Sequence, residues 1–158
     1  MKRRYVLFGF VLASLILITT SYFNTVRSNL SGAPAGYTGS PGDGTSCISC
    51  HSPSRNFTGG TITTNIPSGG YTAGQTYTVT ASITRTGHSR IGFELSPQDT
   101  TSNGNIVGTI AVTNSTTTKV ASTGYVTHKS AGTTASGGAI SWTMNWTAPA
   151  TGHGPVVF

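Results

Sequence analysis

The sequence predicts an all-β protein, an antiparallel β-sandwich of the immunoglobulin-like type, and three observations predict it. Beyond about residue 58, apolar residues alternate with Thr and Ser in short runs, as half-buried strands require. Clusters of Gly, Ser and Asn separate these runs. After the first 30 residues, no segment keeps the apolar period of a helix. Seven or so short strands joined by turns are typical of such a sandwich.

The clearest alternating run covers residues 76–84, where apolar residues share one strand face and Thr and Ser share the other. The same alternation gives a set of residues that we expect to point into the core. They are Ile62, Thr64 and Ile66; Tyr77, Val79, Ala81 and Ile83; Ile91, Phe93 and Leu95; Ile106, Gly108, Ile110 and Val112; and Ile140, Trp142, Met144 and Trp146.

The N-terminal residues have the pattern of an export signal. Lys2, Arg3 and Arg4 precede a largely apolar stretch over residues 5–18, which is shorter than the ~20 residues that a spanning helix needs. We therefore expect residues 1–30 to be a signal peptide or an uncleaved N-terminal anchor, and the protein to be exported to the cell surface, extracellular space or periplasm. Residues 31–58, rich in Gly, Ser and Pro, are expected to form a loop segment, and residues 59–158 the sandwich.

The charge of the chain excludes two classes of function. The net charge is +6, but four of the nine basic residues lie within residues 1–30, which leaves five basic against three acidic residues, or +2. Nucleic-acid binding needs clustered Lys and Arg, so no nucleic-acid partner is expected. The carboxylates are only Asp43, Glu94 and Asp99, which offers little for general acid-base chemistry, so we do not expect an enzyme.

Both cysteines of the chain lie in the segment Cys47-Ile48-Ser49-Cys50-His51. CxxCH is the attachment pattern of c-type haem: two thiols separated by two residues add to the vinyl groups of one porphyrin, and the adjoining histidine binds the iron. The pattern predicts one covalent haem c held by Cys47, Cys50 and His51. Three alternatives stay open: a disulfide in an exported protein, half of a zinc site completed by distant histidines, and a histidine that follows the CxxC only incidentally.

A second axial ligand has to come from elsewhere in the chain. His128 shares a predicted strand face with Val126, so a sheet would hold its ring in a fixed direction. We expect His128 to be this ligand. His88 and His153 lie in glycine-containing turns and Met144 falls on a core face; these three, or an open site, are the alternatives.

Three basic residues flank the candidate ligands in the sequence, namely Arg55, Arg90 and Lys129. Each is expected either to pair with a haem propionate or to be an ordinary solvated charge. Asp43 is expected either to influence the haem edge, because it lies near Cys47 in the sequence, or to be a solvated turn residue, because it precedes Gly44.

These segments together resemble the choice-of-anchor domain proteins, exported bacterial proteins that combine a CxxCH segment with a Reeler-like β-sandwich. Residues 32–44, running into Cys47 and His51, resemble the opening of that family, and residues 70–79 resemble its first strand, with Ala73 where a proline is common. Residues 92–95, 125–128 and 142–149 resemble later landmarks of the family. The resemblance covers about residues 32–158 and implies a Reeler-like sandwich preceded by a haem-binding loop segment.

One departure from the family concerns residues 154–158, where the sequence stops within what should be a strand. We expect either a fragment or an edge that is covered by another copy of the chain, because an open strand edge favours pairing.

The expected function is electron transfer by an exported single-haem c-type cytochrome, attached to a membrane or cell surface, whose partner is a redox protein or a neighbouring cytochrome. The alternatives are a non-redox surface module for adhesion or carbohydrate binding, with a CxxC disulfide, and a haem-based gas sensor with a five-coordinate iron. Trp142, Trp146 and the six tyrosines are the candidate carbohydrate platform, although both tryptophans alternate in phase with Ile140 and Met144, which points to a core.

Overall fold

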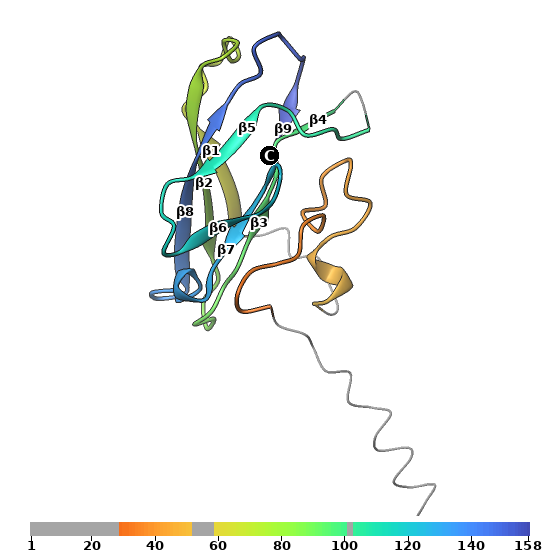
Figure 1. Cartoon of the computed structure of the whole chain (residues 1–158). Coiled ribbons are helices and arrows are strands. Elements are labelled where there is room, and N and C mark those ends of the chain that lie inside the picture. Colours follow the sequence, from red (N-terminus) through yellow and green to blue (C-terminus); the bar gives the residue numbers. More distant parts are fainter. Residues whose placement is uncertain (1–28, 52–58, 101–102) are drawn as a thin grey trace, which may run out of the picture.

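A computed structural model describes residues 29–51, 59–100 and 103–158 of the chain (Figure 1). The strands pair only in antiparallel fashion, which confirms the predicted all-β class. One sheet has the order β1-β2-β8-β5, with bounds Gly60–Thr64, Thr76–Thr84, Ala139–Thr147 and Thr109–Val112. A second has the order β3-β7-β6, with bounds Glu94–Leu95, Tyr125–His128 and Thr118–Ser122. A third small sheet pairs β4 (Gln98–Asp99) with β9 (Val156–Val157).

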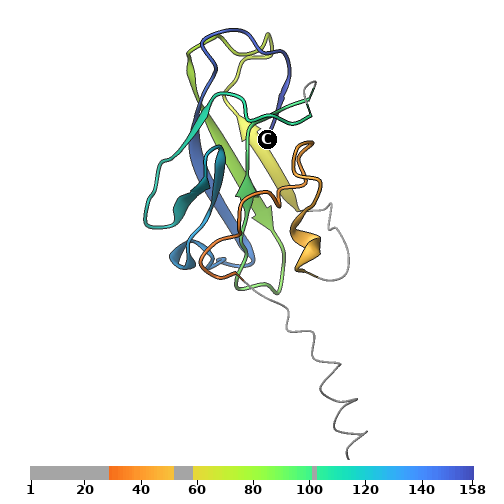
Figure 2. The ribbon, with the colours of Figure 1, turned by 45° about the vertical axis from the view of Figure 1, so that its right-hand side comes forward.

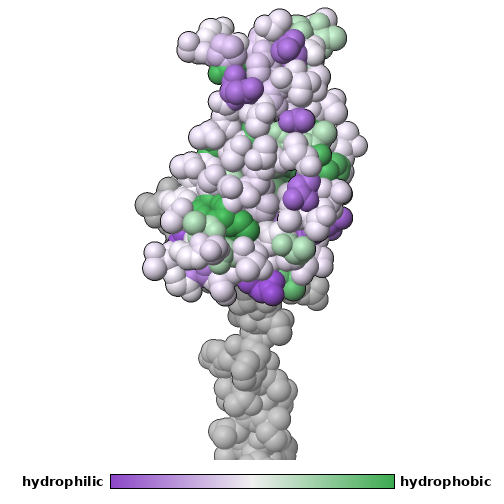
Figure 3. Space-filling view, turned by 90° about the vertical axis from the view of Figure 1, so that its left-hand side faces the viewer, coloured by the Kyte–Doolittle hydropathy of each residue, from purple (hydrophilic) through white to green (hydrophobic). Residues whose placement is uncertain are grey.

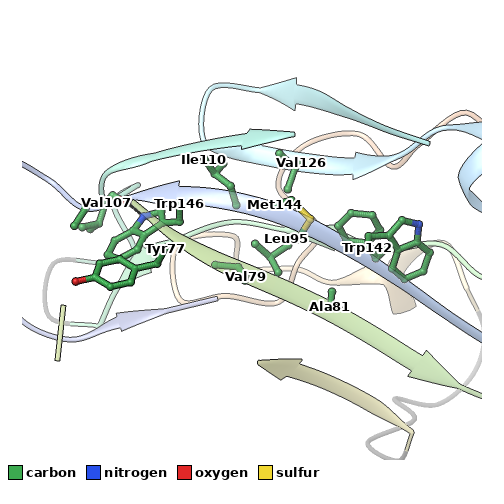
Figure 4. Close-up of a cluster of buried hydrophobic side chains, with 12 residues drawn as sticks. Tyr77, Val79, Ala81, Leu95, Val107, Ile110, Val126, Trp142, Met144 and Trp146 are labelled. Atoms are coloured by element: carbon green, nitrogen blue, oxygen red, sulfur yellow. Dashed lines mark hydrogen bonds between the residues drawn. The ribbon is translucent and has the colours of Figure 1, made fainter. Parts of the chain in front are cut away.

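The core lies between the two larger sheets, and the predicted alternation of β2 and β8 is confirmed. Tyr77, Val79 and Ala81 of β2 are buried, and their register partners on β8 are buried with them: Trp146, Met144 and Trp142. Leu95 and Val126 of the second sheet meet this layer from the other side (Figure 4). Full burial of a side chain of this kind contributes roughly 1.5–3 kcal/mol, so this layer accounts for much of the stability of the sandwich.

The outward face of β2 and β8 carries hydroxyl groups. Thr76 and Thr147 stand opposite each other, with their Oγ1 atoms 2.8 Å apart. The side of the molecule on which β8 lies is correspondingly pale over most of its surface, with few strongly hydrophilic side chains (Figure 3). Threonine suits this position because its β-branched side chain packs well on a pleated surface.

The predicted alternation over residues 106–112 is wrong at its beginning. β5 starts only at Thr109, and Val107 is buried at 2% exposure in place of Ile106. Gly108 has a φ of +71°, and a Cβ atom there would lie 2.3 Å from the Thr147 carbonyl oxygen. The chain turns at this glycine, so the inward face changes from odd to even positions. Ile62 also differs from the prediction: it lies on the edge strand β1 and is 47% exposed.

The C-terminal residues, expected to form a strand with an open edge, pair within the chain. β9 lies antiparallel to β4, with Val157 opposite Gln98, and the Phe158 ring packs edge-on against Trp146 at 5.3 Å between centroids. Self-association through this edge stays a prediction.

Residues 29–51, which we call the lead-in, lie against the side of the sandwich that carries β3 and β7 (Figures 1 and 2). Backbone N–H groups of the lead-in donate to side chains of the sandwich: Ala33 to Thr127 Oγ1 at 3.1 Å, Tyr37 to Glu94 Oε2 at 2.9 Å and Gly42 to Gln98 Oε1 at 2.8 Å. These contacts satisfy donors that the irregular segment cannot pair internally.

Asp43 joins the lead-in to the sandwich, so the expectation of a solvated turn residue is wrong. Its carboxylate accepts hydrogen bonds from the Tyr125 hydroxyl at 2.6 Å, from Gln98 Nε2 at 2.8 Å and from the Thr38 N–H at 2.8 Å. Burial raises the pKa of Asp43, but the hydrogen bonds from Thr38, Tyr125 and Gln98 more than offset this and leave it lowered. The pKa of Tyr125 is raised to about 12 by burial and by its bond to Asp43.

Replacement of Asp43 by asparagine should release the lead-in from the sandwich. We expect Asp43→Asn to lower the free energy of unfolding by about 1–2 kcal/mol, because hydrogen bonds to a charged acceptor are lost. The pKa of Asp43 is lower in the folded state than in the unfolded state. The difference in unfolding free energy between the wild type and Asp43→Asn should therefore be full at a pH above the unfolded-state pKa of Asp43. It should disappear as the pH falls through the folded-state pKa.

Urea unfolding over a pH series, with amide hydrogen exchange of residues 37–46, measures both effects. Thr61→Ala, on the exposed strand β1, is the control and should change neither. Unaltered exchange of residues 37–46 in Asp43→Asn would contradict the role given to Asp43.

Candidate functional site

A cavity of about 340 Å³ lies where the lead-in meets the sandwich. Its described lining residues include all four predicted site residues: Cys47, Cys50, His51 and His128. The first three come from the lead-in and the fourth from β7, so the docked lead-in brings distant parts of the sequence to one cavity. The wall between them is largely apolar, with Leu30, Ala33, Pro34, Ile91 and Phe93.

The cysteines lie on a short turn. η1 (Cys47–Ser49) is a 3₁₀ helix in which the Cys50 and His51 N–H groups both donate to the Cys47 carbonyl, at 3.2 and 2.9 Å. In such a turn residues three apart lie on the same side, which suits two groups that must reach one ligand. Both thiols are free and exposed. Neighbouring protein atoms still raise the pKa of Cys47 by burial, and the Glu94 charge raises it further.

His128 is held at the end of β7 with only 7% of its surface exposed. The Phe93 N–H donates to Nδ1 at 3.0 Å, and Nε2 lies 3.1 Å from the Asn29 carbonyl oxygen. These partners assign the ring proton to Nε2. The Phe93 carbonyl oxygen is also 3.1 Å from Nδ1. Residue 93 can therefore serve either tautomer, and with the proton on Nδ1 the Nε2 lone pair becomes available to a metal.

Gly92 makes room for the His128 ring. A Cβ atom at residue 92 would lie 2.3 Å from His128 Cε1, closer than any side chain allows. The backbone of Gly92 has no positive φ, so the requirement is for space and not for an unusual conformation. The role of Gly92 was not predicted, because a glycine before Phe93 carries no local sign of a ring packed 36 positions later in the chain.

Glu94, on β3, lies behind the lead-in and was not expected to have a role at the site. Its Oε2 atom accepts the Tyr37 N–H, while Oε1 is buried without a hydrogen-bond partner among the described residues. Burial raises the pKa of Glu94 to about 7, and the Asp43 charge adds to the effect, whereas the bond from Tyr37 opposes it.

The alternative axial ligands lie away from this cavity. His88 and His153 are exposed in turns and Met144 is fully buried in the core, as their sequence context predicted. None of the three belongs to the described lining. Over residues 29–51, 59–100 and 103–158, no group of three or more His, Cys, Asp or Glu is placed to hold a metal ion. The zinc alternative therefore finds no complete donor set in that part of the chain.

The basic residues that flank the ligands in sequence separate in space. Arg90 lines the cavity, together with Arg85, which was not predicted to lie there. Lys129 points its Nζ atom to the Ser115 carbonyl oxygen at 2.6 Å and is not among the described lining residues. Arg55 lies outside the described residues.

A family model of the Reeler domain matches residues 45–158, a span that includes the CxxCH segment, every strand and His128. The chain belongs to the Reeler domain family. No curated protein and no solved structure shows significant similarity to it. In this Reeler domain the match begins only two residues before Cys47, so most of the lead-in precedes it.

The described part of this Reeler domain has no helix long and apolar enough to cross a membrane. The predicted leader over residues 1–30 lies almost wholly outside the described residues.

Addition of a methyl group at residue 92 tests the packing of His128. Gly92→Ala should displace the imidazole and lower the free energy of unfolding by about 1–3 kcal/mol, because the well-packed site has no space for another carbon atom. Gly60→Ala is the matched control, since a Cβ atom there would meet nothing within 4 Å and its φ is not positive. Thermal unfolding and the NMR shift of His128 Hε1 report the change; equal behaviour of the two variants would contradict the packing described.

Proposed function

We propose that this Reeler domain protein is an exported, single-haem c-type cytochrome that transfers electrons outside the cytoplasm. Cys47 and Cys50 would hold one covalent haem, and His51 and His128 would be its axial ligands. The observation that supports this most strongly is the cavity, which is lined by the three CxxCH side chains and by a histidine 77 positions away in the sequence.

The residues around the cavity fit a haem in their chemistry. Two thiols three positions apart match two vinyl groups, and two imidazoles match two axial positions. A haem brings four nitrogen ligands of its own, so the protein has to supply no cluster of three or more donors. The apolar wall formed by residues such as Ile91 and Phe93 suits a porphyrin ring.

The chain's own groups prepare His128 for this role. With the ring proton moved to Nδ1, the Phe93 carbonyl would accept a hydrogen bond from Nδ1–H, which would fix the ring and make Nε2 a better donor. The Asn29 carbonyl, now 3.1 Å from Nε2, has to move aside. When bound, the haem supplies a one-electron iron couple, whose potential depends on the axial ligands and on burial.

Electron transfer is favoured over catalysis by the placement of the acidic residues. Asp43 and Glu94 accept hydrogen bonds from the lead-in, and Asp99 is 1% exposed. None of the three belongs to the described lining of the cavity. No carboxylate is therefore placed there as a general acid or base, and two axial histidines would leave the iron without an open position.

The rival interpretation, a non-redox module for adhesion or carbohydrate binding, depended on an aromatic platform of tryptophan and tyrosine rings and on a disulfide. Trp142 and Trp146 are 3% and 0% exposed, and their Nε1 groups donate to the carbonyls of Gly132 and Val107. These rings belong to the core and do not present a binding platform. The two thiols are not joined.

Export and the partner follow from the same proposal. Haem is attached to CxxCH outside the cytoplasm, in agreement with the predicted leader over residues 1–30. The site of action would be the cell surface, extracellular space or periplasm, with attachment to a membrane or cell surface. The partner would be a redox protein or a neighbouring cytochrome.

Substitution of His128 tests the axial assignment. In a host that attaches c-type haem, the wild-type chain should give a low-spin spectrum that carbon monoxide barely shifts. His128→Ala should keep the covalent haem but give a high-spin form that binds carbon monoxide, because one axial position opens.

His88→Ala and His153→Ala are the matched controls and should retain the wild-type spectrum, since both side chains are exposed in turns. A low-spin spectrum in His128→Ala would exclude His128 as the ligand. An absorption spectrum with and without carbon monoxide, beside a pyridine haemochrome assay, gives all of these readings.

A further inference from the structure

Two arginines face the cavity that holds the thiols and imidazoles. Arg85 directly follows β2 and Arg90 precedes the apolar wall, so both lie in the loop that connects β2 to β3. Both are exposed, as expected at the mouth of a cavity. The described lining includes no Asp or Glu that could neutralise these two arginines, so their positive charge faces the cavity.

The loop that carries these arginines is fixed at both of its ends. The Arg85 N–H donates to the Gly138 carbonyl at 2.7 Å, and the Ile91 N–H donates to the Thr133 carbonyl at 2.9 Å. Gly138 permits the first contact, because a Cβ atom there would lie 2.4 Å from the Arg85 carbonyl oxygen. The two guanidinium groups are thus carried by a loop held in place, which lowers the entropic cost of binding a ligand between them.

The Arg90 side chain itself is also held. Its Nη1 atom donates to Thr133 Oγ1 at 2.9 Å, and Thr133 is 3% exposed and lines the same cavity. This bond directs the guanidinium group along the cavity wall and leaves its remaining N–H groups for another acceptor. Arginine presents its donors in a planar fork that matches a carboxylate.

We propose that Arg85 and Arg90 form a carboxylate clamp, which binds the two propionate groups of the haem and fixes the orientation of the ring in the cavity. The inference rests on the proposed function. A porphyrin carries its vinyl and propionate groups at different edges, so a ring tethered through its vinyl groups to Cys47 and Cys50 directs its carboxylates elsewhere. The β2–β3 loop, a different element from the one that holds the cysteines, supplies the cations that these carboxylates require.

The clamp makes a prediction about the reduction potential. Loss of two positive charges beside the haem stabilises the oxidised, more positive form of the iron relative to the reduced form. The midpoint potential should therefore fall. We expect Arg85→Gln/Arg90→Gln to retain covalent haem and low-spin ligation, to shift the midpoint potential to more negative values and to alter the circular dichroism of the Soret band. Each single variant should give a smaller shift in the same direction.

The matched control is Lys119→Gln/Lys129→Gln, which removes the same net charge from the sandwich at residues outside the described lining. Redox titration and circular dichroism of the isolated holoprotein measure both effects with no partner protein present, so a shift confined to the arginine variant reports haem carboxylates. Equal potentials and Soret signals in the two double variants would overturn the clamp while leaving the cytochrome proposal intact. Absence of covalent haem from the wild-type chain would overturn the cytochrome proposal, and the clamp with it.

Discussion

The docking of the lead-in onto the sandwich is the constraint on which the rest of the structure depends. Residues 29–51 contain no strand and no long helix, and they gain their fixed path from groups on β3, β4 and β7. Asp43 is central to this docking, because one carboxylate meets donors from both sides of the interface. Together with the bonds that Ala33, Tyr37 and Gly42 donate to the sandwich, it holds the CxxCH turn beside His128.

The sandwich contributes rigidity, and the segments around it contribute chemistry. β2 and β8 form nine register pairs and bury their aromatic rings between the sheets. His128 extends from this frame at the end of β7, and the Phe93 backbone fixes its ring. In the proposed cytochrome, a ligand held on such a frame would keep its direction, which would limit reorganisation when an electron is gained or lost.

The fold was predictable wherever burial has a simple period. The alternation of β2 and β8 revealed which residues face the core, because a two-residue period has no other common cause. The prediction failed at Gly108, where a glycine in a left-handed conformation shifts the inward face, and periodicity carries no sign of that shift. The position of β9 against β4 depends on contacts between residues nearly sixty positions apart and was likewise beyond local patterns.

The candidate site was predictable in its chemical groups and not in their surroundings. CxxCH is a local pattern, and the strand around His128 is visible in the sequence. Gly92, Glu94 and Arg85 act through space on residues far along the chain, so their contacts emerge only from the folded structure. Asp43 was misjudged for the same reason: its sequence neighbours indicate a turn, while its partners Gln98 and Tyr125 lie far away in the sequence.

The central claim is that one porphyrin is bonded to the turn that the docked lead-in brings to the cavity. Intact-mass and peptide mass spectrometry of the full chain, matured in a host that attaches c-type haem, test it most directly. The account predicts a mass increase of one haem, located on the peptide that contains Cys47 and Cys50. An unmodified peptide, a disulfide between these cysteines, or zinc as the only ligand would contradict it.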